Sequence, residues 1–215
     1  MVRKTREEAE QTRQQLLDAA EQLFSEHGVS RTSLAEIATA AGLTRGAVYW
    51  HFQNKLDLYR AMMDRVSAPF DELREQLLQS AGADPARALW DHSHKLLVLV
   101  AENAQVRRIL LILFMRSEHV GELAPIHDEC VAHMHEARGL LGQVVMAAMD
   151  RGQALPGIDP DDVAVVLQSL HEGLMSRLLV ESPCPEATDA VSRLLQYLYR
   201  GIFLPQVMEQ LTTCR

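Results

Sequence analysis

The sequence predicts an all-α protein, and three observations support that prediction. Apolar residues recur at the three- to four-residue spacing of a helix face along most of the chain. No stretch shows the apolar–polar alternation of a half-buried β-strand. The 215 residues are 47% apolar and 23% charged, which is typical of a globular protein with one large or two small domains.

The first predicted helix spans residues 7–27. Gly28 follows it, and glycine suits a helix end because it adopts the left-handed conformation without strain. The apolar residues of this stretch fall on one face, which predicts that this face is buried. They are Leu16, Leu17, Ala20, Leu23 and Phe24.

Two shorter helices are predicted next, at residues 33–40 and 44–51. Ser33 and Glu36 have the spacing of a capping box, in which each side chain bonds the backbone of the other residue. Gly42 permits a tight turn between the two helices. A short helix, a glycine-containing turn and a second short helix together have the layout of a helix-turn-helix unit.

In such a unit the second helix enters the major groove of DNA with its N-terminal residues at the base edges. Thr44 is a suitable N-cap for this helix, and Arg45 can present two donors to a guanine edge. Val48 and Phe52 fall on the other side and are expected to pack inward. The alternative is that these short helices form only a core. An exposed face with Arg, Thr, Tyr, Trp and His favours DNA binding.

The charge distribution agrees with a DNA-binding N-terminus. The net charge of the chain is −8, which taken alone argues against nucleic acid. Residues 1–60 contain eight Lys and Arg and eight Asp and Glu, so they are neutral overall. The remaining residues carry the whole negative charge. Any contact with DNA is therefore expected within the first 60 residues.

Six longer helices are predicted in the rest of the chain. Asp84 and Pro85 are a suitable cap and first residue for one of them. Loops rich in glycine and proline are expected at residues 152–160 and 182–185. The predicted helices span residues 54–79, 85–102, 105–118, 125–151, 161–180 and 188–204.

Two stretches of the N-terminal region resemble the signature of the TetR family of repressors, and more closely its AcrR and TtgR branch. They are Thr32–Ala38 and Ala41–Lys55, and the opening Val2–Arg6 is similar to that branch as well. Weaker similarity begins at Arg107 and again at Glu172. The resemblance is dense over residues 1–60 and extends over the rest of the chain only in length and helical layout.

The resemblance implies nine or so helices, with a three-helix helix-turn-helix head at the N-terminus and a C-terminal helical domain. It assigns residues 1–53 to DNA binding and residues 54–215 to ligand binding and dimerisation. It further implies a homodimer, an inverted-repeat operator of double-stranded DNA, and a small hydrophobic effector that releases the DNA. The residues that would contact DNA are Lys4, Thr32, Ser33, Thr44, Arg45, Gly46, Tyr49, Trp50, His51 and Lys55.

The C-terminal domain contains the residue types that an apolar ligand site needs. Methionines suit such a site because they repack easily, and a few polar residues, His171 among them, stand on largely apolar helices. The candidate ligand residues are Leu96, Leu110, Phe114, Met134, Gln168, Glu172 and Ser176. Related repressors can carry Asn and His where this chain has Leu110 and Phe114, so a more apolar pocket is expected. The alternative is that this apolar stripe is ordinary core.

The helices predicted at 161–180 and 188–204 carry more apolar residues than one domain needs to bury. They are expected to form a four-helix dimer seam, and a charge at Leu195 or Leu198 is expected to split the dimer. Burial of both helices within the monomer is the alternative.

Other functions have weaker support. No nucleophile elbow, phosphate loop or dinucleotide fingerprint occurs, so an enzyme is not expected. The histidines at 92/94 and 133/135 lie two apart and so on different helix faces, which disfavours metal binding. No cofactor and no membrane span is expected, and the protein is interpreted as cytoplasmic.

Together these features predict a ligand-responsive repressor of a multidrug efflux operon, released by hydrophobic or aromatic drug-like molecules. The alternatives are a sensor of one metabolite or metal ion, and a binding protein whose head has lost its DNA function.

Overall fold

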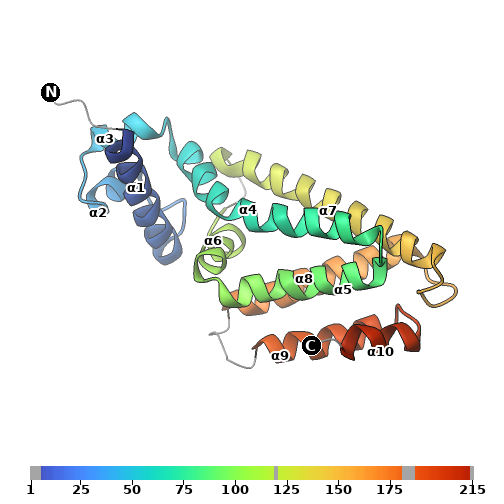
Figure 1. Cartoon of the computed structure of the whole chain (residues 1–215). Helices are drawn as coiled ribbons and strands as arrows, with labels where there is room; N and C mark the ends of the chain where they lie inside the picture. The colour runs from blue at the N-terminus through green and yellow to red at the C-terminus, as the bar shows by residue number, and fades with distance from the viewer. Residues whose placement is uncertain (1–5, 119–120, 181–186, 214–215) are drawn as a thin grey trace. The chain divides into compact units, whose positions relative to one another are not determined.

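The computed structural model describes residues 6–118, 121–180 and 187–213. Over these residues the chain forms ten α-helices and one short 3-10 turn, which confirms the all-α prediction (Figure 1). The helices are α1 (Arg6–His27), α2 (Leu34–Ala40), α3 (Arg45–His51), α4 (Lys55–Ala81), α5 (Pro85–Glu102), α6 (Ala104–Met115), α7 (Ala124–Asp150), α8 (Pro160–Val180), α9 (Ala187–Tyr199) and α10 (Pro205–Thr213). The 3-10 turn, η1, is Gly121–Leu123.

The chain divides into two compact units, each of which is made of two segments. The first unit is Met1–Ser67 with Arg108–Asp128, and the second is Ala68–Arg107 with Glu129–Arg215. The first unit therefore contains the start of α4 and the last two-thirds of α6 in addition to the three N-terminal helices. The functional boundary expected between residues 53 and 54 stays a prediction.

The core of the first unit forms where α1, α2 and α3 pack together. Val48 is fully buried and Phe52 is 2% exposed, so both pack inward as predicted. The start of α4 adds Leu58, Tyr59 and Met62, all fully buried. The apolar face of α1 is buried at Leu16, Leu17, Ala20 and Phe24.

A buried carboxylate joins three helices of the first unit. Glu21 on α1 is 2% exposed and forms an ion pair with Arg65 on α4. Arg65 also pairs with Asp18 at 2.7 Å and donates to Gln14, so α4 is tied to α1 at several points. Arg108 on α6 lies 3.9 Å from the second oxygen of Glu21. Because a lone buried charge is costly, these arginines are what allows Glu21 to be buried as an anion.

The end of α6 meets the turn between α1 and α2. Gly28 ends α1 with φ +85°, as the sequence predicts. The next residue, Val29, donates its backbone N–H to the carbonyl oxygen of Arg116 at 3.0 Å. A Cβ atom on Gly28 would lie 3.3 Å from that same oxygen, so both φ and the close approach favour glycine here. Tyr59 and Ser117 bond through their hydroxyls at 2.9 Å.

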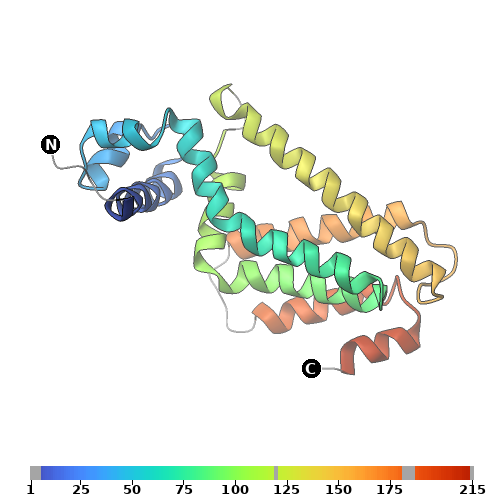
Figure 2. The same cartoon turned by 45° about the horizontal axis from the view of Figure 1, so that its top comes forward.

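In the second unit, α5, α8 and α9 lie side by side and share one apolar core (Figures 1 and 2). Leu195 is fully buried in this core and Leu198 is half-buried against it. The expectation that a charge at Leu195 would act on a dimer seam is therefore wrong, because the side chain packs within its own chain. On the same helix Leu194 is 37% and Tyr197 is 69% exposed.

A chain of hydrogen bonds crosses the core of the second unit. Tyr199 donates to the carbonyl oxygen of Leu89 at 2.7 Å, so its hydroxyl accepts from Ser93, also at 2.7 Å. The Ser93 oxygen then accepts from Nε2 of His171 at 2.8 Å, which requires the tautomer with a proton on Nε2. His171, considered above as a polar group near the ligand site, is thus part of the core.

The C-terminal helix α10 was not predicted. The helix expected to run to residue 204 ends at Tyr199, because Phe203 forms an isolated antiparallel bridge with Ala154. Pro205 then begins α10. Arg87 on α5 donates to the carbonyl oxygens of Gln210 (2.6 Å) and Leu211 (3.2 Å), which fixes the last turn of α10 on the second unit.

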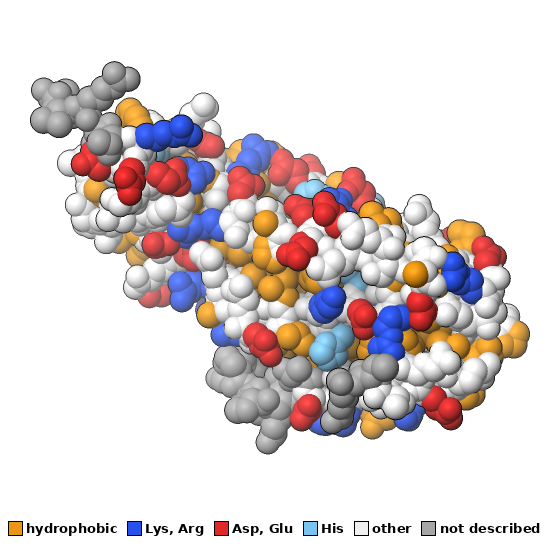
Figure 3. All heavy atoms as spheres, in the orientation of Figure 1, with side chains coloured by type: hydrophobic (Ala, Val, Ile, Leu, Met, Phe, Trp, Pro, Cys, Tyr) orange, Lys and Arg blue, Asp and Glu red, His pale blue; other side chains and the backbone are white. Residues whose placement is uncertain are grey.

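The predicted loop at residues 152–160 is present, whereas the one at 182–185 lies outside the described residues. The helix α8 is long and apolar enough to cross a membrane, with a mean hydropathy of 1.3. Its Val163, Leu167 and Leu179 are buried in the second unit, and 28% of the apolar window is buried. Val165 and Val166 remain about half exposed. On the face shown in Figure 3, acidic and basic side chains are interspersed.

Candidate nucleic-acid interface

The helix α2 begins with the predicted capping box. The Ser33 hydroxyl oxygen accepts from the backbone N–H of Glu36 at 3.3 Å, and the Glu36 carboxylate accepts from the Ser33 backbone N–H at 2.7 Å. The Ser33 hydroxyl also donates to the same carboxylate at 2.7 Å. These bonds lower the pKa of Glu36, since they stabilise its charged form. The start of α2 is therefore set by local contacts.

The turn between α2 and α3 is tight and is closed by backbone hydrogen bonds. Gly42 has φ +68°, a conformation that favours glycine. Leu43 donates its N–H to the carbonyl oxygen of Ala38 at 2.8 Å. Thr44 then caps α3, because its hydroxyl oxygen accepts from the N–H of Ala47 at 3.3 Å. Together these bonds hold the two helices as one helix-turn-helix unit.

The helix α3 buries one side and exposes the other. Val48 faces the core, while Tyr49 is 62% and Trp50 is 72% exposed. Tyr49 and Trp50 are adjacent in sequence, and neighbouring exposed aromatic side chains are what a contact surface would present. The predicted base-contacting residues Thr44, Arg45 and Gly46 are exposed at the start of the same helix. His51 is half-buried and packs edge-on against Trp50, with 4.5 Å between ring centroids.

Besides the caps Ser33 and Thr44, two more of the residues expected to contact DNA have structural roles within the head. Thr32 is 2% exposed, and its hydroxyl donates to the carbonyl oxygen of Gly28 at 2.9 Å. The Lys55 ammonium donates to the carbonyl oxygens of Val29 (3.0 Å) and Thr32 (3.3 Å). Both side chains therefore hold the turn between α1 and α2. Their contacts with DNA stay predictions, and Lys4 lies outside the described residues.

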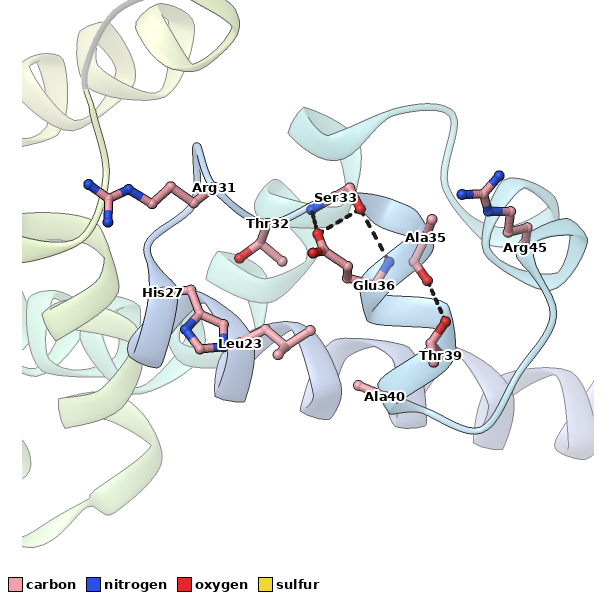
Figure 4. A pocket seen from close by; sticks show the side chains of 10 residues that line it. All are labelled: Leu23, His27, Arg31, Thr32, Ser33, Ala35, Glu36, Thr39, Ala40 and Arg45. Atoms are coloured by element: carbon pink, nitrogen blue, oxygen red, sulfur yellow. Dashed lines mark hydrogen bonds between the residues drawn. The ribbon is translucent and has the colours of Figure 1, made fainter.

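A hollow of about 570 Å³ opens on the head beside α3. It is lined by the exposed residues of α2, by the end of α1 and the turn that follows, and by Arg45 (Figure 4). Arg31 lies at one end of the hollow and Arg45 at the other, with Ser33 and Glu36 between them (Figure 4). Arg31 was not among the residues predicted to contact DNA. The one feature of the sequence that points to it is its position directly before the Thr32–Ala38 motif.

Comparison with known proteins identifies the family. A model of the bacterial regulatory proteins of the tetR family matches residues 16–62. The HTH-type transcriptional regulator TtgR of Pseudomonas putida is 34% identical over 94% of this chain and 95% of its own length. The chain belongs to the TetR family. The helix-turn-helix head described above is thus the DNA-binding element of a TetR-family transcriptional repressor, which is a regulator and not an enzyme.

Solved structures of other repressors share the fold over most of the chain. NalD, described as the secondary repressor of the MexAB-OprM multidrug efflux pump in Pseudomonas aeruginosa, is 36% identical with a TM-score of 0.80 and covers 92% of this chain and 99% of its own. SmeT of Stenotrophomonas maltophilia, solved with triclosan, is 30% identical with a TM-score of 0.71 and covers 91% and 93%.

The candidate ligand residues of this TetR-family chain fall in both units. Leu110 is buried and Phe114 is 43% exposed, and both belong to α6 in the first unit. The other five lie in the second unit. There the structure brings three of them together, since the Gln168 amide donates to the Met134 carbonyl oxygen at 3.3 Å and to the Glu172 carboxylate at 2.9 Å. Leu96 and Ser176 are half-buried. The ligand site as a whole stays a prediction.

Proposed function

We propose that this protein represses a multidrug efflux pump operon and leaves its operator when a hydrophobic or aromatic drug-like molecule binds. The observation that carries the proposal is similarity over almost the whole chain to repressors of such pumps, including NalD at 36% identity. SmeT, another relative, is solved with triclosan, a small apolar aromatic compound. The protein would act in the cytoplasm, where its operator is.

The DNA-binding step follows from the face of α3. Arg45 presents a planar fork that matches the N7 and O6 acceptors of guanine, with Thr44 and Gly46 beside it at the base edges. Tyr49, Trp50 and His51 follow along the helix and would meet the backbone. A homodimer would place two such heads on the two halves of an inverted repeat.

Release from DNA is proposed to be a shift between two populations of the protein. A ligand that binds more tightly to a conformation unable to hold both heads on the operator lowers the apparent DNA affinity. A coupling free energy of about 1–3 kcal/mol corresponds to a change of roughly 5- to 150-fold in operator affinity. Since linkage is reciprocal, operator DNA must weaken ligand binding by the same factor.

The first experiment tests repression at its DNA step. The full-length protein is used to select duplexes from a random pool, and the selected duplex is then compared with a shuffled duplex of the same composition. The expected result is an inverted repeat bound on the order of 10³-fold or more tightly than the shuffled control. Equal affinity for both duplexes would refute operator recognition.

The second experiment tests induction with known efflux-pump substrates. Calorimetry measures the affinity of each compound for the protein alone and for the protein bound to the selected duplex. Weaker binding in the presence of DNA is expected for inducers. Phe114→Glu is expected to remove the response while DNA binding is retained, because Phe114 is exposed. Leu110 is buried in the unit that contains the head, so Leu110→Glu is expected to disturb that unit as well. Compounds that bind equally with and without DNA would refute the switch, and release by metal ions alone would favour the alternative of a metal sensor.

A further inference from the structure

The hollow on the head has a cationic side chain at each end. Arg31 and Arg45 are both exposed, and Figure 4 shows them at opposite ends with the exposed face of α2 between them. Thr39 and Ala35 from α2, and His27 from the end of α1, are also part of the lining. All of these residues belong to the first unit, so their arrangement is that of the head alone.

The charges in the hollow favour an anionic partner. Glu36 is the carboxylate among the lining residues, and its Oε2 accepts two hydrogen bonds from Ser33, each of 2.7 Å. The two guanidinium groups have planar forks that match the oxygens of a phosphate. The hollow is also continuous with the DNA-reading face, because Arg45 belongs to both.

We propose that this hollow seats one strand of the operator's sugar–phosphate backbone, and that Arg31 contacts a phosphate there. The proposal rests on the operator recognition proposed above. In helix-turn-helix proteins the first helix crosses the backbone while the second reads the groove. Here the exposed face of α2 is the floor of the hollow, and the strand that leaves the base edges at Arg45 would run along it to Arg31.

Arg31 and Arg45 should then have separable effects on binding. A phosphate carries no sequence information, so loss of Arg31 weakens binding to every duplex by a similar factor. Loss of Arg45 removes a base contact and lowers the ratio between specific and non-specific affinity. Each phosphate contact adds about 0.9 to the slope of log affinity against log salt for B-form DNA. Removing Arg31 should therefore lower that slope by about 0.9 for each head on the duplex.

The test uses the full-length chain with the selected duplex and its shuffled control, between about 50 and 200 mM salt. The variants are Arg31→Ala, Arg31→Lys and Arg45→Ala. Arg74→Ala is the matched control, because Arg74 is an exposed arginine of α4 in the second unit that pairs with Asp71. Fluorescence anisotropy measures affinity, and circular dichroism shows that each variant is folded.

The expected result is that Arg31→Ala weakens both duplexes severalfold and lowers the salt slope, while Arg31→Lys retains most of the slope and Arg74→Ala changes neither quantity. If Arg31→Ala matches the wild type in affinity and slope, or alters the specificity ratio as Arg45→Ala does, the proposed contact is refuted while operator recognition stands. If the wild type selects no sequence at all, the proposed function fails and this inference fails with it.

Discussion

Lys55 has a structural role within the DNA-binding head. Its ammonium bonds two carbonyl oxygens in the turn that links α1 to α2, and this turn leads directly into the capping box of α2. A lysine within a DNA-binding sequence motif is easily interpreted as a contact to a DNA phosphate. In this structure it also closes a loop whose carbonyl groups would otherwise need water.

Replacing Lys55 should therefore affect stability as well as DNA binding. Hydrogen bonds from a charged donor contribute about 1.5–3 kcal/mol, so Lys55→Met is expected to lower the free energy of unfolding by an amount of that order. Chemical denaturation measures it. Lys55→Arg, which keeps donors and charge, serves as the control. An unchanged midpoint for Lys55→Met would show that the loop does not depend on this side chain.

Arg45 differs from Lys55 because its predicted role is only to contact DNA. It is exposed at the first position of α3, so Arg45→Ala should leave the fold unchanged. Loss of a bidentate guanine contact is expected to cost about 1–3 kcal/mol per head and to relax the preference at one base pair in each half-site. Repeating the duplex selection with the variant shows this directly. Selection of an unchanged sequence with unchanged affinity would contradict the assignment.

His171 makes the stability of the second unit depend on pH. Burial, with a smaller contribution from the nearby ring of His92, lowers its pKa from 6.5 to about 3. Above pH 6.5 the histidine is neutral in both the folded and the unfolded chain, so stability does not change. Below that pH His171 is protonated in the unfolded chain but stays neutral in the folded chain. Stability should fall by up to about 1.4 kcal/mol per pH unit down to about pH 3.

Urea denaturation across that pH range measures the effect. His171→Gln should reduce the slope of stability against pH, because the group that titrates in the unfolded chain is gone. His133→Gln provides a control, since His133 is exposed on α7. An identical slope for wild type and His171→Gln would exclude His171 as its source.

At the scale of elements, the helix ends that could be predicted from the sequence are those fixed by contacts between residues close together in the chain. The starts of α2 and α3 could be predicted because Ser33 and Thr44 bond backbone groups three residues away. The end of α9 was missed because the apolar pattern continues through Ile202, while the bridge between Phe203 and Ala154 joins residues far apart in sequence. Gly201 and Pro205 were available signals for that break. The candidate ligand site was the least predictable, since its residues come from four helices far apart in sequence.

The helix α6 connects the two units through consecutive arginines. Arg107 belongs to the second unit and donates to the Ala101 carbonyl oxygen at 2.7 Å. Arg108 belongs to the first unit and pairs with Glu21 on α1. We therefore expect a ligand-induced change at Arg107 to be passed along the chain to Arg108.

Removing Arg108 should weaken induction with little effect on folding. The pair is long at 3.9 Å and Arg108 is half exposed, so its loss should cost less than about 1 kcal/mol, while Glu21 keeps its pair with Arg65. We expect Arg108→Ala to bind the selected duplex and the inducer nearly as the wild type does. The ratio of DNA affinities without and with inducer should shrink. An unchanged ratio would show that Arg108 takes no part in coupling.

At the scale of the whole molecule, the exposed apolar residues of α8 and α9 are what a homodimer would cover. Val166 is 48%, Leu194 37% and Tyr197 69% exposed. Tyr197→Asp and Leu194→Asp are expected to give a folded monomer that binds the operator weakly, because one head makes half of the contacts. Leu195→Asp should instead unfold the second unit, since Leu195 is fully buried. Light scattering with circular dichroism separates these outcomes, and a wild-type monomer would end the dimer proposal.

Because the first unit consists of two segments far apart in sequence, its contacts cannot all form at the same stage of synthesis. Val29 and Tyr59 emerge from the ribosome well before their partners Arg116 and Ser117. Residues 68–107, which belong to the other unit, must be synthesised in between. At about 5–20 residues per second this takes roughly 2–8 s. During that interval the nascent head lacks its contacts with Arg116 and Ser117, so a ribosome stalled before residue 116 would carry a helix-turn-helix head that is synthesised but not yet stabilised by them.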